Sequence, residues 1–251
     1  MNKFQIEKLH KDYYKLGIGN SPGYKEKKLI AAINNIDYIQ DINRKHNPLI
    51  PPKNKQTNAI FAAYQYLLMQ THEKKTVSKE LIITTHKIRT QNENGHTAID
   101  KITNDAIERL CNTINAQLHN NANETLQVSF DAHTHLMAIH PWDECWPDAL
   151  MLMHYIQTIT NIPLTVIDKE DIKLYFSFLE IQNSENVTFE ATFENFMLLQ
   201  HIKMLKSEII AFRNLSESTP KILAGLAERQ EKGEFKINEI NITNLWEDMN
   251  V

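Results

Sequence analysis

The chain has 251 residues, of which 42 % are hydrophobic and 23 % charged, enough for the core of one large domain or two small ones. Its 27 Lys and Arg residues nearly balance 31 Asp and Glu residues without a basic block, which argues against a nucleic-acid surface. Two cysteines imply no disulfide framework, and no apolar run approaches the roughly 20 residues that cross a bilayer. We expect no nucleic-acid partner, no membrane span and a reducing compartment.

With six Gly and eight Pro in the whole chain, turn signals are too few for an all-β fold with many hairpins. We therefore predict an all-α protein in which helices are joined by short polar connections. Asn104 is expected to cap one of these helices, and the composition of 119–124 is that of a loop. Apolar residues at helical spacing indicate, in chain order, helices over 25–45, 58–69, 78–87, 104–118, 130–140, 148–160, 169–181, 189–207 and 221–229.

The helix over 148–160 is apolar on most sides, which is typical of a central, buried helix. A short loop leads into it from the preceding helix, and this loop is the main candidate for a functional site. It reads His140-Pro141-Trp142-Asp143-Glu144-Cys145-Trp146-Pro147-Asp148.

The run Ile139-His140-Pro141-Trp142-x-Glu144 resembles the opening of the Fic (Fido) family motif, His-Pro-Phe-x-[Asp/Glu]-Gly-Asn-Gly-Arg. The order of helices around the loop is also similar to that family, and the resemblance covers roughly residues 55–207. The other matching runs are Glu80-Leu81-x-x-x-x-His86, Ala132-His133, Leu150-Met151-Leu152-Met153-x-Tyr155, Ile162-Pro163-Leu164-Thr165-Val166-Ile167 and Phe193-x-x-Phe196.

The resemblance implies a Fic-type helical bundle over 55–207 with a short or vestigial β-hairpin flap. In the family this flap pairs with the backbone of the target protein. The candidate strands here are 88–90 and 97–99. The rest of the chain would form an N-terminal helical extension over 1–54 and a partly helical C-terminal tail over 208–251.

In the family the motif histidine is a general base that takes the proton from a Ser, Thr or Tyr hydroxyl of a target protein. That hydroxyl then attacks the α-phosphate of a nucleotide. The resemblance gives this catalytic role to His140. It assigns the Mg²⁺ ion to Glu144 and a backbone N–H contact with the nucleotide to Cys145. ATP and Mg²⁺ would be the cofactors of an active protein, whereas a protein without transfer activity would need none.

The second half of the motif is replaced in this chain. Trp146 adds bulk, Pro147 has no backbone N–H to donate, and Asp148 reverses the charge of the family's phosphate-binding Arg. At an effective dielectric near 20, exchanging an attractive for a repulsive unit charge at about 4 Å costs several kcal/mol. Ordinary nucleotide transfer should therefore be badly impaired.

Pro147 and Asp148 also fit a purely structural role. Proline is favoured in the first turn of a helix, and Asp is stabilised near a helix N-terminus. The alternative is a changed site for a divalent cation or a cationic ligand, formed by His140, Asp143, Glu144 and Asp148.

Side chains next to the motif have two kinds of expected role. His133 and His135 lie on different faces of a helix, so His133 is expected to face the core or to support the site from behind. Trp142 is expected to pack beneath the loop in place of the family's Phe. Cys145 could pair with His140 as a nucleophile, since a helix N-terminus lowers the pKa of a thiol.

We therefore predict a degenerate Fic-type protein that lacks standard AMP-transferase activity and acts by binding a protein partner. The open alternative is an active transferase that moves AMP or another phosphate-linked group onto a protein hydroxyl by an altered nucleotide-binding mode. Self-association into a homo-oligomer is compatible with either. No signal-peptide pattern follows Met1, so the protein is expected in the cytoplasm, or delivered into another cell without a conventional signal peptide. The Asn- and Lys-rich composition is typical of AT-rich bacterial genomes.

Overall fold

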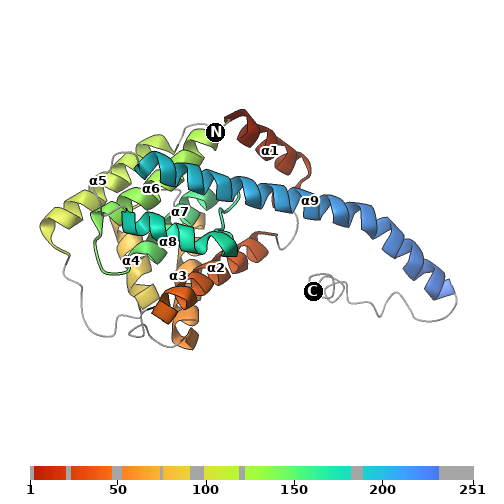
Figure 1. Ribbon diagram of the computed structural model, residues 1–251, viewed down its shortest axis with the longest axis horizontal. Helices are drawn as coiled ribbons and strands as arrows, with labels where there is room; N and C mark the ends of the chain where they lie inside the picture. Colours follow the sequence, from red (N-terminus) through yellow and green to blue (C-terminus); the bar gives the residue numbers. More distant parts are fainter. Residues whose placement is uncertain are drawn as a thin grey trace. The chain divides into compact units, whose positions relative to one another are not determined.

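The computed structural model describes residues 3–20, 24–46, 53–73, 76–90, 99–118, 122–181 and 189–231. Every regular element in these ranges is a helix, which confirms the all-α class for this part of the chain (Figure 1). The elements are α1 (Lys3–Lys15), η1 (Ile18–Asn20), α2 (Tyr24–His46), α3 (Lys53–Glu73), α4 (Lys79–Thr90), α5 (Lys101–Gln117), α6 (Ala122–Ile139), α7 (Trp146–Ile159), η2 (Lys169–Asp171), α8 (Ile172–Ile181) and α9 (Phe189–Glu231).

The chain divides into two compact units, Met1–Leu205 and Lys206–Val251. In the first unit the most extensive helix contacts are those of α6 with α7, α3 with α4, α5 with α6, and α2 with α3 (Figure 1). In the second unit the described part is the C-terminal portion of α9. No helix in the described part of the chain is both long and apolar enough to cross a membrane.

Helix α7 is the centre of the first unit. Every residue from Trp146 to Gln157 is buried, as the apolar sequence of this helix predicts. Helices α3, α4 and α6 all contact it. The two N-terminal helices belong to the same core, to which α1 contributes Ile6 and α2 contributes Ile33, Ile36 and Ile39.

Several predicted boundaries are wrong, for local reasons. Asp100, not Asn104, caps α5, because its side chain accepts a hydrogen bond from the Thr103 backbone N–H at 2.9 Å. Asn104 instead donates its side-chain amide to the Ile99 carbonyl at 3.2 Å. The predicted loop over 119–124 is wrong for 122–124, which belong to α6, and 119–121 lie outside the described residues.

The first candidate strand of the flap, 88–90, is the last turn of α4 and is therefore wrong as a strand. A tertiary contact of Arg89, described below, explains why the helix continues this far. In the second candidate strand, 97 and 98 lie outside the described residues, and 99 precedes α5 without strand structure. The separately predicted helix over 221–229 is part of α9, which is one continuous helix of 43 residues.

A chain of buried polar side chains crosses the first unit. His154 Nε2 lies 2.8 Å from the Thr165 carbonyl oxygen and must donate to it, so His154 Nδ1 accepts from the Tyr64 hydroxyl at 2.5 Å. The Thr165 hydroxyl accepts from Gln157 Nε2 at 3.0 Å and lies 2.8 Å from Nδ1 of His201. This chain joins α3, α7 and α9 through the segment that follows α7.

Candidate functional site

The candidate site is the loop between α6 and α7. His140 still makes a helical bond, with its N–H 3.1 Å from the Leu136 carbonyl oxygen, but its φ of 47° turns the chain out of the helix. Glu144 also has a left-handed φ, 52°, which is uncommon for a residue other than glycine. Both side chains are exposed. Cys145 then occupies the N-cap of α7 without a side-chain capping bond.

Asp148 lies in the first turn of α7, where its side chain faces the core and is 3 % exposed. Arg89 of α4 is the partner of this carboxylate. Arg89 Nε lies 2.8 Å from Asp148 Oδ1, and Arg89 Nη2 lies 2.8 Å from Asp148 Oδ2. This is a bidentate, buried ion pair, the geometry in which a guanidinium and a carboxylate bind each other most strongly.

Four more contacts surround this ion pair. Trp142 Nε1 donates to Asp148 Oδ2 at 2.7 Å, and His86 Nδ1 lies 3.0 Å from the same oxygen. The rings of His86 and Trp142 stack with centroids 3.9 Å apart. Arg89 Nη2 also donates to the Glu144 carbonyl at 3.2 Å. We call His86, Arg89, Trp142 and Asp148 the Asp148 cluster; it fastens α4, the loop and α7 together.

Within the Asp148 cluster, the negative charge of Asp148 is balanced by the positive charge of Arg89. Burial acts to raise the pKa of Asp148, but the charge and hydrogen bonds of Arg89, and then those of His86, outweigh it and hold the pKa below its usual value. Burial acts to lower the pKa of Arg89, and Asp148 reverses that effect. Asp148 is therefore ionised and Arg89 is its counter-ion. A phosphate at this end of α7 would find the guanidinium of Arg89 already paired with Asp148.

The interpretation of Pro147 and Asp148 as a helix start is confirmed, because both lie in the first turn of α7. Trp146 and Pro147 are buried as well. The Trp146 ring packs edge-on against Tyr175 and Phe176 of α8, and its Nε1 has no hydrogen-bond partner within the described ranges. Trp142 lies beneath the loop as expected, with the added hydrogen bond to Asp148 that a Phe could not make.

The alternative in which Cys145 is an activated nucleophile is not supported. Its side chain is 1 % exposed, and burial, followed by the charge of Asp148, raises the pKa of the thiol to about 12. Desolvation therefore outweighs the stabilisation that a helix N-terminus gives to a thiolate. The thiol does lie near two other side chains, with Sγ 3.8 Å from His140 Nδ1 and 3.5 Å from Met137 Sδ.

His133 lies deep in the core and is 0 % exposed. Its Nε2 is 2.9 Å from the Tyr175 hydroxyl, and its ring stacks on Phe193 at 5.1 Å. Burial lowers its pKa to about 3, so the ring is neutral. His135 is exposed, with Nδ1 2.7 Å from the Asp131 carbonyl oxygen, and the two histidines do lie on different faces of α6.

The carboxylates of the loop do not gather around His140. Asp143 and Glu144 are exposed, whereas Asp148 points into the core. The described residues contain no group of three or more His, Cys, Asp or Glu side chains that could hold a metal ion. The alternative of a carboxylate-rich cation site is therefore wrong within this part of the chain. The role of His140 as a base, and of Glu144 as the ligand of a nucleotide-bound Mg²⁺, stay predictions.

Sequence reasoning did not place His86 or Arg89 at the site; it named His86 only as part of the family resemblance. A signal for them exists, because positions three apart on a helix share a face. In α4 that face also carries the buried residues Leu81, Ile82 and Thr85, so two polar side chains there need a buried partner. The sequence does not tell that this partner is Asp148.

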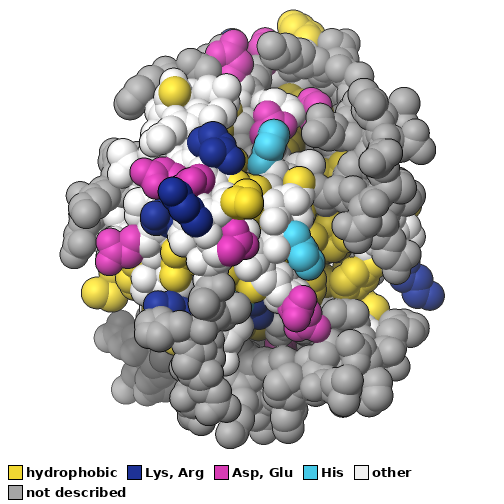
Figure 2. All heavy atoms as spheres, turned by 90° about the vertical axis from the view of Figure 1, so that its left-hand side faces the viewer, with side chains coloured by type: hydrophobic (Ala, Val, Ile, Leu, Met, Phe, Trp, Pro, Cys, Tyr) yellow, Lys and Arg dark blue, Asp and Glu magenta, His cyan; other side chains and the backbone are white. Residues whose placement is uncertain are grey.

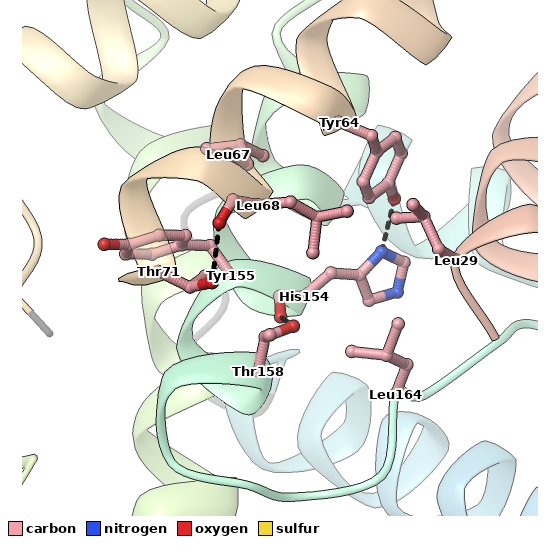
Figure 3. A pocket seen from close by; sticks show the side chains of 9 residues that line it. All are labelled: Leu29, Tyr64, Leu67, Leu68, Thr71, His154, Tyr155, Thr158 and Leu164. Atoms are coloured by element: carbon pink, nitrogen blue, oxygen red, sulfur yellow. Dashed lines mark hydrogen bonds between the residues drawn. The ribbon is translucent and has the colours of Figure 1, made fainter. Parts of the chain in front are cut away.

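A small cavity lies beside the His154–Tyr64 hydrogen bond, where the His154 ring is held between Tyr64 and Leu164 (Figure 3). Its free volume is about 10 Å³, room for about one water molecule and far too little for a nucleotide. It is lined by Leu29, Tyr64, Leu67, Leu68, Thr71, His154, Tyr155, Thr158 and Leu164.

Comparison with known proteins gives no match: neither a protein-family model nor a curated protein matches this chain. The likeness of the loop to the Fic motif therefore depends on the residues quoted above.

Proposed function

We propose that this chain is a Fic-like helical scaffold that does not transfer nucleotides and acts by binding another protein. One observation carries the proposal: the side chain of Asp148 is turned inward and is fully engaged by Arg89, His86 and Trp142. At the position where the Fic motif has a cation for phosphates, this chain has an anion with its own counter-ion. The start of α7 thus contributes to the stability of the folded protein.

The surroundings of Asp148 support the same conclusion. Trp146 and Pro147 fill the first turn of α7 and are buried, so the space a phosphate would need is taken by side chains. Pro147 also removes one backbone donor from this turn. On the face in Figure 2, acidic and basic side chains are interspersed among the coloured residues, and no field of one sign marks a place for a polyanion.

Two measurements on the purified protein test the absence of transfer. Calorimetric titration with ATP and Mg²⁺ should give no binding at high micromolar nucleotide. Intact-mass spectrometry after incubation with ATP, Mg²⁺ and a bacterial protein extract should show no AMP added to the chain or to extract proteins. An AMP adduct that disappears with His140→Ala would overturn the proposal.

A second candidate function is an active transferase with an altered nucleotide-binding mode. The observation in its favour is that His140 and Glu144 are both exposed and both held at positive φ, and strained backbone often persists where a site needs it. In this scheme His140 takes the hydroxyl proton and Glu144 holds Mg²⁺. Activity would then require Mg²⁺ and would fall with Glu144→Ala but not with Asp143→Ala, a matched exposed carboxylate next to it.

A further inference from the structure

The end of α6 and the start of α7 bring together three side chains that the proposed scaffold function does not use. Met137 and His140 stand three positions apart at the end of α6, and Cys145 is the N-cap of α7. Cys145 Sγ is close to both of the others, 3.5 Å from Met137 Sδ and 3.8 Å from His140 Nδ1. We propose that Met137, His140 and Cys145 form a binding site for one soft monovalent metal ion, Cu(I).

The two separations from Cys145 Sγ are close to those expected when one metal ion binds all three donor atoms. With metal–sulfur bonds of about 2.3 Å and metal–nitrogen bonds of about 2.0 Å, three ligands in one plane lie about 4.0 Å (S to S) and about 3.7 Å (S to N) apart. The Cys145–His140 separation of 3.8 Å matches this value. The Cys145–Met137 separation of 3.5 Å must widen by about half an ångström, which the flexible Met side chain allows.

The donor set selects the kind of ion. A thiolate and a thioether are soft ligands that prefer Cu(I), and an imidazole suits copper as well. Hard divalent ions prefer carboxylate oxygens, but Asp148 is held by Arg89, and no carboxylate lies in the described contacts of Cys145 Sγ. A Met sulfur is therefore the third ligand where the described residues offer no third His, Cys, Asp or Glu.

The balance of charge favours a monovalent ion. Cys145 is buried, and a buried net charge is costly. On binding, the S–H bond breaks, a sulfur–Cu(I) bond forms and the proton leaves to water. The copper stays in the +1 state, so nothing is oxidised or reduced. Thiolate and Cu(I) together carry no net charge, so the site remains neutral.

One of the three ligands is accessible from solvent. The His140 side chain is exposed, and Met137 is partly buried. The ion can bind the imidazole first and then reach the two sulfur atoms. Because the site uses only these three side chains, it does not depend on whether the loop transfers nucleotides.

The test is an anaerobic titration of the purified protein with Cu(I), using a chromophoric Cu(I) chelator as competitor. We expect one ion per chain, and X-ray absorption of the complex should show both sulfur and nitrogen ligands. Cys145→Ser, His140→Gln and Met137→Leu should each weaken binding by at least roughly tenfold to a hundredfold. The controls Cys111→Ser and His135→Gln change the other cysteine and an exposed histidine of α6, and should bind as the wild type does.

The proposal is overturned if wild-type protein fails to compete with the chelator or if Cys145→Ser retains full affinity. It is also overturned if Met137→Leu binds normally, since the thioether would then not be a ligand. Far-UV circular dichroism of each variant confirms that it is folded, so a loss of binding can be assigned to the lost ligand.

Discussion

His10 and His201 share a hydrogen bond between their Nε2 atoms, 2.8 Å apart, at the buried contact of α1 with α9. The Thr165 hydroxyl accepts from Gln157 and so can donate to His201 Nδ1; His201 Nε2–H then donates to His10. Both rings must be neutral for this arrangement, because an imidazolium has no acceptor nitrogen. Burial lowers the pKa of His10 to about 4 and, with the charges of His10 and Lys28, lowers that of His201 well below its usual value.

This buried contact predicts that the protein loses stability in mild acid. The unfolded chain binds protons at histidine below a pKa of about 6.5, whereas the folded chain resists protonation of His10 and His154 down to about 4 and of His133 down to about 3. The histidines therefore make their whole contribution to the free energy of unfolding above about pH 6.5. This contribution is lost progressively as the pH drops towards 4. One shift of this size corresponds to a loss on the order of 3 kcal/mol.

Urea unfolding at pH 7.5, 6 and 5 measures this loss. His10→Gln keeps a polar partner for His201 but cannot be protonated, and should make the pH dependence shallower. His135→Gln, at an exposed position of the same protein, should leave it unchanged. A free energy of unfolding that stays constant from pH 7.5 to 5 would contradict the prediction.

The Arg89–Asp148 ion pair predicts a large cost for removing either partner alone. Asp148→Asn keeps the shape of the side chain but leaves a buried guanidinium without its counter-ion, which should cost about 3–5 kcal/mol of unfolding free energy. Arg89→Met should cost a similar amount. The double variant Arg89→Met/Asp148→Asn should be less destabilised than the sum of the two, and chemical denaturation of all four proteins gives the coupling energy. Additive effects would mean that the pair does not act as a unit.

Cys145 is predicted to be unreactive in the folded protein. Its pKa of about 12 and its burial leave almost no accessible thiolate at neutral pH, and the pKa of Cys111 is raised by burial to about 11. Iodoacetamide at pH 7 should label neither residue quickly until denaturant is added, as followed by intact-mass spectrometry. Rapid labelling of Cys145 alone, mapped by peptide analysis, would be inconsistent with the structure.

Two alanine variants test whether Asp100, and not Asn104, is the N-cap residue of α5. Asp100→Ala should lower the melting temperature because it removes the acceptor of the Thr103 N–H. Asn104→Ala, at the position that the sequence alone suggested, should have the smaller effect. Asp100→Ser retains an N-cap acceptor and should recover most of the loss. A larger drop in melting temperature for Asn104→Ala than for Asp100→Ala would show that Asn104 is the cap.

Local patterns in the sequence predicted much of the helical framework. The apolar residues of α7 predicted its central position, and Pro147 with Asp148 predicted where the helix begins, because these preferences act within a single turn. The resemblance to the Fic family misjudged Ile88-Arg89-Thr90, which it made a candidate strand of the flap. A tertiary contact of Arg89 decides that segment, and propensity is too weak to oppose it.

The polar interior could not be predicted, for a different reason. His10 and His201 are 191 positions apart, and no periodicity links α1 to α9. The candidate site was found from its motif, but the sequence does not tell that Asp148 faces inward while Glu144 faces solvent. Only the direction of each side chain distinguishes a ligand from a structural residue, and that direction depends on the packing of α4 against α7.

The ion pair at the start of α7 also limits which substitutions this loop can accept in evolution. A cation at position 148 would stand beside Arg89 in the core, and the two would repel each other with no water to screen them. Placing a cation there requires a change at position 89 as well, and either change alone gives a less stable protein. The ion pair therefore couples positions 89 and 148, so that neither can change its charge alone without a loss of stability.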